Sequence, residues 1–323
     1  MTKVFRRRGL LAAAPLLMAP GLARAQGRPN VRIVVPYPPG GTVDATARFL
    51  SPRAAELLNQ NWVIENRSGA NGAIGADAVA RAAPDGMTLL YSNEVLLMLK
   101  HVQRNMPLDP LTDLTPIVRT ATVPQILVGS PRHIPHQDIR GLLEALRRNP
   151  TRYSFATPTL GSLGQLGAAA LGQALGIEVL IVAYRGTGPA VQDVIAGNVS
   201  LLISPAGGVA PLIRDGQLRA FAVCSPQRIP GFPDLPTLSE IGFPDLVFES
   251  WTAMWGPRGL PAEIVNRVHA TMNQVVGEPE MQRRIFDLGC TPIQEPLGRM
   301  AQQIAIEEER NPRLARLAKI TPE

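Results

Sequence analysis

The feature that most constrains the fold is an apolar run followed by a proline- and glycine-rich turn and then by a helical pattern. Residues 31–35 are β-branched at four of their five positions, which is typical of a buried strand. Residues 36–41 contain too many prolines and glycines for regular structure, so the strand must end there. Over residues 47–57 apolar side chains recur at helical spacing, and we expect Thr42 or Asp44 to supply the N-cap oxygen of this helix.

A strand, a glycine turn and a helix N-terminus in this order form a natural site for an anion. Free backbone N–H groups and the positive end of the helix dipole point to one place, and glycines let a ligand approach the backbone closely. The alternative is a turn that only joins the strand to the helix, a role that glycine often has. The turn alone does not decide between the two interpretations.

The same pattern recurs along the chain in two series. In the first, the strand expected over residues 87–91 ends at Ser92 and Asn93. In the second, three strands are each followed by a small, glycine-rich, hydroxyl-bearing turn and a helix. Alternating strands and helices predict parallel sheets with right-handed crossovers, in which ligands bind beyond the carboxyl ends of the strands. The strands of the second series are expected over residues 153–157, 178–183 and 199–203, and the last precedes a turn at 204–208 and a helix at 209–215.

Two short strands, expected over residues 114–119 and 125–129, separate the two series. We therefore place one α/β domain at residues 26–120 plus 240–323 and a second at residues 121–239. The two sets of glycine turns then belong to different domains. If these turns face each other, they form a cleft that can close on a small anion.

The first 25 residues have the composition of an export signal. Arginines at residues 6–8 precede an apolar stretch, and Ala23 and Ala25 fit the small-x-small cleavage pattern. The paired arginines also suit a twin-arginine signal. We expect a signal peptide over residues 1–25 and a mature, soluble protein in the periplasm.

The charge of the mature chain argues against a nucleic-acid partner. The whole chain has a formal net charge of +6, but residues 1–25 carry five basic and no acidic residues. What remains is close to neutral, whereas binding to nucleic acid needs a concentrated basic face. No other stretch approaches the roughly 20 apolar residues that a membrane helix needs.

Residues that would indicate a metal site or an active site are scattered or missing. The four histidines have no partners at metal-ligand spacing, so no metal is expected. The sequence contains no Gly-x-Ser-x-Gly elbow, no His-Glu-x-x-His motif and no complete Walker loop, so we do not expect an enzyme, with an exported hydrolase as the alternative. Cys224 and Cys290 are compatible with a disulfide or with two buried free thiols.

Several stretches together resemble one known family: residues 36–44 (PYPPGGTVD), 65–72 (ENRSGANG), 83–90 (APDGMTLL) and 184–186 (YRG), and the pair Ser250-Trp251. In this order and spacing, over nearly the whole chain after the signal, they look like the Bug family, the solute-binding receptors of tripartite tricarboxylate transporters. The resemblance implies an α/β, two-domain periplasmic binding protein (Venus-flytrap), with mainly parallel sheets flanked by helices and an interdomain ligand cleft.

The resemblance also implies a function. Receptors of this family bind small carboxylates through backbone amides and hydroxyls, so we expect a mono- or dicarboxylate ligand and no metal or cofactor. The expected partner is a membrane permease with one large and one small subunit, and the receptor itself is expected to be a monomer. A solute sensor that acts through a membrane partner without transport is an alternative that the sequence does not separate from uptake.

Carried over by position, the resemblance places ligand-binding residues on loops of both domains. Asp44 either contacts hydroxyl or ammonium groups of the ligand or only caps its helix, and Arg185 either holds a carboxylate or forms a salt bridge. Residues 163–165 (LGQ) depart from the family's serines and histidine, so we expect a more apolar pocket. The implied ligand contacts are Tyr37, Gly40, Gly41, Thr42, Asp44, Ser92, Asn93, Thr157, Gly161, Ser162, Tyr184, Arg185, Gly186, Ser204 and Pro205.

Overall fold

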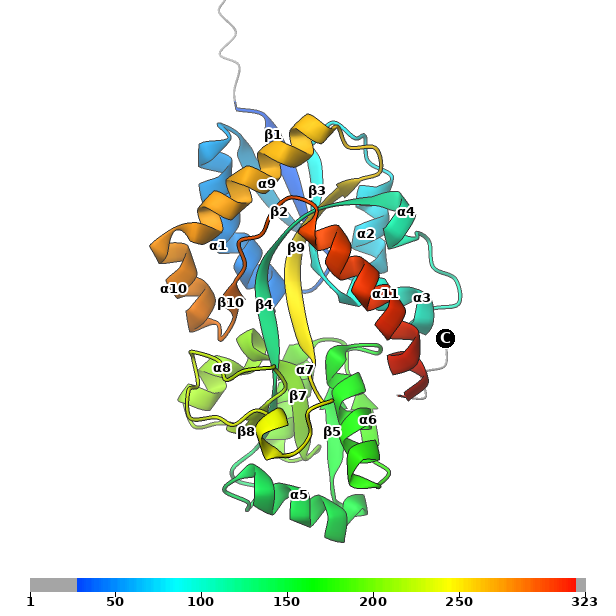
Figure 1. Cartoon of the computed structure of the whole chain (residues 1–323), viewed down its shortest axis with the longest axis vertical. Helices are drawn as coiled ribbons and strands as arrows, with labels where there is room; N and C mark the ends of the chain where they lie inside the picture. The colour runs from blue at the N-terminus through cyan, green and yellow to red at the C-terminus, as the bar shows by residue number, and fades with distance from the viewer. Residues whose placement is uncertain (1–27, 318–323) are drawn as a thin grey trace, which may run out of the picture.

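The computed structural model describes residues 28–317 and has two lobes stacked along its long axis (Figure 1). The export signal expected over residues 1–25 lies outside the described residues. We call the lobe with the N-terminal strands the upper lobe and the other the lower lobe. Two long strands, β4 (Leu114–Gly129) and β9 (Glu249–Pro257), pair antiparallel and run from one lobe toward the other.

The upper lobe is built on three parallel strands, with β1 in the middle. Ile33 of β1 lies in register with Ile64 of β2 and with Leu89 of β3. Helices α1 and α9 cover one face of these strands, and α2, α3 and α11 cover the other. The elements are β1 (Asn30–Val35), α1 (Thr42–Leu57), β2 (Asn61–Asn66), η1 (Ala70–Gly72), α2 (Ala73–Ala80), β3 (Thr88–Asn93), α3 (Val95–Val102), α4 (Pro110–Asp113), α9 (Ala262–Gly277), α10 (Pro279–Asp287), β10 (Thr291–Pro292) and α11 (Arg299–Leu317).

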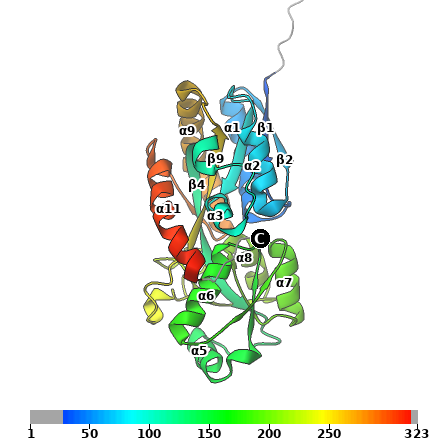
Figure 2. The same cartoon turned by 90° about the vertical axis from the view of Figure 1, so that its right-hand side faces the viewer.

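The lower lobe repeats this arrangement. Phe155 of β5 lies in register with Ile181 of β6 and Leu201 of β7, again with parallel pairing. Helices α5 and α6 pack on one face and α7 and α8 on the other, and Figure 2 shows the strands between α6 and α7. The elements are α5 (Ile139–Arg148), β5 (Ser154–Thr157), α6 (Leu163–Leu175), β6 (Leu180–Ala183), α7 (Thr187–Ala196), β7 (Leu201–Pro205), α8 (Ala206–Arg214) and β8 (Arg219–Val223).

One sheet of ten strands passes through both lobes, in the order β2-β1-β3-β9-β4-β7-β5-β6, with β8 and β10 also paired to β4. Pairing is parallel among the outer strands of each lobe. Helices cover both sides of the sheet and bury the apolar runs of β1, β3, β5 and β7, whereas the edge strands β2 and β6 expose Val63 and Leu180. Pairing is antiparallel around β4 and β9, which join the lobes. The predicted α/β fold class is confirmed.

The strands expected over residues 114–119 and 125–129 are wrong in one respect, because they form the single strand β4. A proline normally interrupts a strand, but Pro124, at the end of the expected gap, pairs with Glu249 of β9, and the register shifts between Arg119 and Ala121, where the gap was expected to begin. The continuous strand matters for the site because it connects the two lobes directly.

The two cysteines do not form a disulfide in this structure. Cys224 and Cys290 are both free and buried. Burial raises the pKa of each thiol to about 12, so both stay protonated. Of the two interpretations left open by the sequence, the structure has the buried free thiols.

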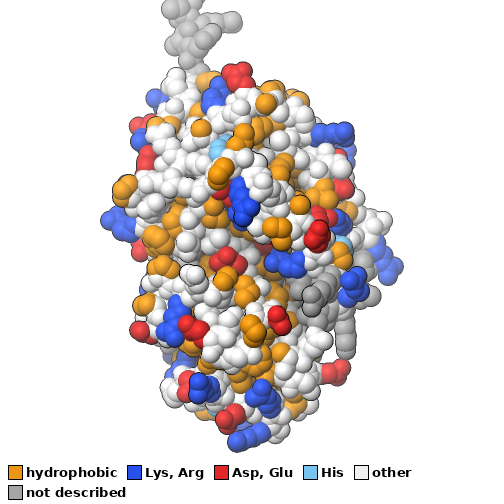
Figure 3. All heavy atoms as spheres, viewed as in Figure 1, with side chains coloured by type: hydrophobic (Ala, Val, Ile, Leu, Met, Phe, Trp, Pro, Cys, Tyr) orange, Lys and Arg blue, Asp and Glu red, His pale blue; other side chains and the backbone are white. Residues whose placement is uncertain are grey.

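On the face of the molecule in Figure 3, basic and acidic side chains are interspersed and do not gather into one basic patch. Within residues 28–317, none of the helices is both long enough and apolar enough to cross a membrane.

Candidate functional site

The first glycine loop and the end of β3 meet at the carboxyl edge of the upper-lobe strands. The Tyr37 hydroxyl donates a hydrogen bond to Asn93 Oδ1 at 2.6 Å, and this oxygen also accepts from the Val95 N–H at 3.3 Å. Burial raises the pKa of Tyr37 above its usual range, so the phenol stays protonated and remains a donor. Two predicted site residues that lie far apart in the sequence are therefore in direct contact.

Asp44 supports this loop from inside. Its side chain is only 3% exposed and accepts hydrogen bonds from the Gly40 N–H at 3.0 Å, Arg48 Nε at 2.9 Å and Asn66 Nδ2 at 2.8 Å. Burial acts to raise the pKa of Asp44, but the hydrogen bonds from Arg48, Gly40 and Asn66 outweigh it, so the pKa is lowered and the carboxyl stays ionised. Its oxygens are thus engaged within the loop and with α1.

The N-terminus of α1 has no side-chain cap. Gly41 is the N-cap residue, so the expected cap by Thr42 or Asp44 is wrong. A β-carbon on Gly40 or Gly41 would meet nothing within 4 Å. Thr42 Oγ1 and Ser92 Oγ are buried, and neither makes a hydrogen bond with the described part of the chain. Backbone N–H groups of the first turn and two buried hydroxyls therefore remain for a ligand.

The loop between β5 and α6 is hydrogen-bonded to itself. Ser162 caps α6 by accepting from the Gln165 N–H, and its Oγ lies 2.7 Å from Thr157 Oγ1. The Gly161 N–H donates to Gln165 Oε1 at 2.7 Å. The expectation that residues 163–165 form an apolar pocket wall is wrong for Leu163, whose side chain is buried in the lower-lobe core.

Gln165 is a supporting residue that the sequence interpretation missed as such. Ser162 and Gln165 have the Ser-x-x-Gln spacing of a capping box, in which the third helical residue turns back to the chain before the helix. From that spacing, the sequence could have predicted that the Gln165 side chain supports the loop. The polar groups of this loop are largely paired within the loop itself.

The next turn of the lower lobe is fastened to this loop. The Tyr184 N–H donates to the Thr157 carbonyl at 2.9 Å, and the Gly186 N–H donates to the Pro158 carbonyl at 2.7 Å. The Tyr184 hydroxyl donates to Asp193 of α7 at 2.6 Å. Burial, together with the Asp193 carboxylate, raises the pKa of Tyr184 to about 12. The predicted residues of the two loops thus lie side by side at the carboxyl edge of the lower-lobe strands.

Ser204 and Pro205 belong to a strand end. The predicted turn at residues 204–208 is wrong, because β7 includes both residues and α8 begins immediately after them. The helix predicted over residues 209–215 is present as α8 (Ala206–Arg214), but it begins three residues earlier. Ser204 is fully buried, and its Oγ donates to the Pro205 carbonyl at 3.4 Å. Pro205 is the N-cap residue of α8 and offers no side-chain hydrogen bond to the first turn.

The N-termini of α1, α7 and α8 meet where the two lobes touch. A β-carbon on Gly207 would lie 2.5 Å from Thr42 Oγ1, and one on Gly208 would lie 2.6 Å from Thr187 Cγ2. Glycine at both positions allows these close approaches. Gly186 is the N-cap residue of α7 and also lacks a side-chain cap. One helix from the upper lobe and two from the lower lobe therefore direct uncapped N-termini to one region.

Arg185 is exposed at the turn that precedes α7 and makes no ion pair with the described part of the chain. The salt bridge considered from the sequence is thus not formed, and the guanidinium can meet an anion. Within residues 28–317, no group of three or more His, Cys, Asp or Glu side chains is placed to hold a metal ion.

Glu94 is a further residue that sequence reasoning missed. It follows Asn93, is 4% exposed, and accepts hydrogen bonds from the Ser250 hydroxyl and from the Trp251 N–H at 3.3 Å. Burial raises the pKa of Glu94 to about 7, against the hydrogen bond from Ser250 and with the help of the Glu307 charge. An acidic residue directly after a strand end at the expected site was the available signal. Glu94 ties the end of β3 to β9.

This architecture, with two α/β lobes whose loop edges face each other, defines the class of two-domain periplasmic binding proteins. Residues 46–319 match the family model described as the tripartite tricarboxylate transporter family receptor. The chain belongs to this family of periplasmic solute-binding receptors, the Bug family.

Individual relatives agree with this assignment. Over 290 residues the chain is 37% identical to a protein of the tcbD-tcbE intergenic region of Pseudomonas sp., a match that covers 88% of this chain and 86% of the relative. A protein of R. palustris solved with adipate is 32% identical and superposes with a TM-score of 0.85 over 91% of this chain and 98% of the other. The periplasmic binding protein BugD is 29% identical, with a TM-score of 0.83 over 91% of this chain and 99% of its own.

Proposed function

We propose that this protein captures a small mono- or dicarboxylate between its lobes and delivers it to a tripartite tricarboxylate-type membrane permease of one large and one small subunit. The observation that carries the proposal is the meeting of three uncapped helix N-termini beside the buried, unpaired hydroxyls of Thr42 and Ser92. All of these groups donate hydrogen bonds, and a carboxylate is an acceptor with two oxygens. Neutral oxygens also accept hydrogen bonds, but an anionic oxygen makes the stronger bond to these donors.

The charges around this region suit an anion. The negative charge of Asp44 is compensated by Arg48 at 2.9 Å. Arg185 is exposed at the N-terminus of α7 without an ion-pair partner in the described chain. The helix dipoles of α1, α7 and α8 add positive potential at the same place. The sum favours a ligand with one or two carboxylates.

The two-sided arrangement suits a ligand with two carboxylates. The donors of α1 belong to the upper lobe and those of α7 and α8 to the lower lobe, so an aliphatic dicarboxylate can engage one lobe with each end. The R. palustris relative was solved with such a compound, adipate. We take the predicted domains, residues 26–120 plus 240–323 and residues 121–239, as the two bodies that close on it.

A thermal-shift experiment on the purified mature protein tests the ligand class. Adipate, malate and benzoate are compared with adipamide, which keeps the length of adipate but has no charge. A ligand that binds only the folded state stabilises it by about 2.7 kcal/mol at a concentration one hundred times its Kd. We expect at least one carboxylate to raise the Tm and adipamide to leave it unchanged. A response to amines or sugars with silence across the carboxylates would contradict the proposal.

Delivery is tested separately from binding. Proteoliposomes containing a tripartite tricarboxylate-type permease should accumulate the labelled carboxylate only when the receptor is added, and the receptor should elute as a monomer during size-exclusion chromatography. Tight binding without accumulation by such a permease would favour a solute sensor over an uptake receptor.

A further inference from the structure

A second contact between the lobes lies beside α8 and away from its N-terminus. Arg214, the last residue of α8, donates from Nη1 to the carbonyl of Asp287 at 2.8 Å. Asp287 is the last residue of α10 in the upper lobe, and carbonyls in the last turn of a helix lack helical partners and carry the negative end of the dipole. A guanidinium of the lower lobe therefore caps a helix of the upper lobe.

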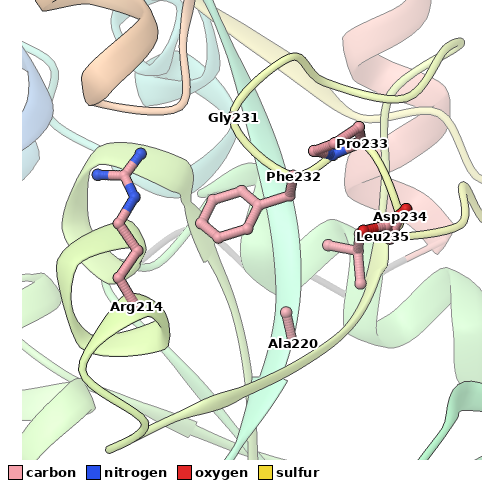
Figure 4. Close-up of a pocket in the computed structure, with 7 residues that line it drawn as sticks. All are labelled: Arg214, Ala220, Gly231, Phe232, Pro233, Asp234 and Leu235. Carbon is pink, nitrogen blue, oxygen red and sulfur yellow. The ribbon is translucent and has the colours of Figure 1, made fainter.

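The side chain of Arg214 is held in place by its own lobe. Its guanidinium carbon lies 5.6 Å from the centre of the Phe232 ring. Figure 4 shows the two side chains at a surface hollow that Gly231 and Leu235 also line. The aromatic contact restricts a long, flexible side chain, so less conformational entropy is lost when the hydrogen bond to the other lobe forms.

Small residues let the two backbones approach each other around this hydrogen bond. A β-carbon on Gly231 would lie 3.5 Å from the Cα of Gly289, and one on Gly289 would lie 3.0 Å from Ala206 Cβ and 3.7 Å from Ala210 Cβ. Because Ala206, Ala210 and Arg214 are spaced by four residues, they share one face of α8. We call this face the latch face.

The opposite side of the molecule is joined by continuous elements (Figure 1). Helix α11 begins in the upper lobe, where Ile304 is buried in a cluster with Trp255, and ends with Ala315 buried among lower-lobe residues. Strands β4 and β9 also extend between the lobes. The paired strands β4 and β9 cannot separate without unfolding, whereas the latch face is joined to the upper lobe by non-covalent contacts alone. Opening of the lobes therefore breaks the latch-face contacts.

We propose that Arg214 is a positioning residue for ligand capture, which holds the lobes closed through the Asp287 carbonyl without touching the ligand. This inference rests on the proposed function, because closure retains a solute only in a binding protein. A bond that exists only in the closed form increases the population of that form, and the apparent affinity rises with the population of the competent state.

The decisive comparison uses three variants at exposed arginines. Arg214→Met keeps the aliphatic stem and removes the donor, and Arg214→Lys keeps a charged donor. Arg140→Met on α5 is the matched control, far from the contact between the lobes. Small-angle X-ray scattering gives the radius of gyration without ligand, and calorimetry gives the Kd for adipate. For Arg214→Met we expect a larger radius and an affinity lower by about three- to tenfold, the equivalent of one exposed charged hydrogen bond. Arg214→Lys should restore most of both values.

A second variant tests the contact between the lobes by steric exclusion. Gly207→Ala places a methyl group against Thr42 Oγ1 of the other lobe, a contact that separation of the lobes would relieve, and alanine is the better helix former. We expect a larger radius of gyration at an undiminished unfolding temperature, which separates opening of the lobes from misfolding. The radius is the readout for this variant, because Gly207 lies at the proposed ligand site, where a methyl group would also obstruct adipate directly.

The outcomes distinguish the latch from the function on which it rests. If Arg214→Met matches Arg140→Met in radius of gyration and in Kd, the proposed role of Arg214 in closure is contradicted, while adipate binding by the unmodified protein stands. If the unmodified protein binds no carboxylate, the proposed function is contradicted, and the radius alone then decides whether Arg214 holds the lobes together.

Discussion

At the scale of single residues, Gly41 offers the clearest test of where the ligand sits. Its backbone has φ −80° and ψ 169°, an extended conformation that valine adopts readily, and a β-carbon there meets nothing within 4 Å. Gly41→Val should therefore fold normally while its branched side chain covers the uncapped first turn of α1. We expect the affinity for adipate to fall by about tenfold or more, the equivalent of at least about 1.4 kcal/mol, with little change in Tm.

Calorimetric titration and thermal unfolding measure these two quantities. Gly41→Ala is the graded control, because its smaller side chain should weaken binding less. An affinity equal to that of the unmodified protein for both variants would show that the first loop is not at the ligand.

The raised pKa of Glu94 predicts that the stability of the fold depends on pH. Burial raises its pKa from 4.5 to about 7, so between these values the folded protein keeps a proton that the unfolded chain has lost. The contribution of this group to stability is complete below the lower value and is lost as the pH rises through about 7. Glu94→Gln cannot ionise, so its stability relative to the unmodified protein should rise by about 1–3 kcal/mol over this range.

Urea unfolding at several pH values between about 5 and 8 measures this difference. Glu263→Gln, at an exposed position of α9, is the matched control and should give a curve parallel to that of the unmodified protein. Parallel curves for Glu94→Gln as well would rule out the proposed titration of the buried carboxyl.

At the scale of elements, the first turns of α6 and α7 form a matched pair. Gly164 and Gly188 each occupy the second helical position, but a β-carbon on Gly164 would collide with the Ile203 carbonyl of β7, whereas one on Gly188 would meet nothing within 4 Å. Gly164→Ala should cost about 1–3 kcal/mol through overpacking. Gly188→Ala should be neutral or gain up to about 1 kcal/mol from helix propensity. Chemical unfolding of both variants, without ligand, measures the difference, and equal effects would contradict the packing argument.

The sequence predicted elements well where local pattern decides and poorly where contacts between elements decide. The strand expected over residues 31–35 is β1 (Asn30–Val35), because its β-branched residues favour a buried strand. The turn expected at residues 204–208 is a strand end and a helix, because Gly207 and Gly208 serve close packing against other helices instead of a turn. No periodicity in the sequence distinguishes these two uses of glycine.

At the scale of the whole molecule, the predicted site residues come together because the carboxyl ends of parallel strands share an edge, which the order of the elements implies. The contact of Thr42 with Gly207, by contrast, depends on how one lobe sits on the other. That placement is set by the continuous β4, which the sequence divided into two strands, and by α11. A pattern of local elements carries no information on such a placement.

The same connections predict that the two lobes unfold as one cooperative unit. Strands β4 and β9 pair from Leu114 to Pro124, with two register shifts, and Ala315 of α11 is buried in the lower lobe. All three tryptophans, Trp62, Trp251 and Trp255, lie in the upper lobe, so fluorescence reports that lobe, whereas far-UV circular dichroism reports both. Coupling of the lobes requires coincident transitions by the two probes.

A variant confined to the lower lobe makes this test strict. Gly164→Ala perturbs packing between α6 and β7 in the lower lobe, whereas every tryptophan lies in the upper lobe. If the lobes unfold together, the urea midpoint from fluorescence should fall by the same amount as the midpoint from circular dichroism. A fluorescence midpoint that stays at its original value while the other falls would show two independent units.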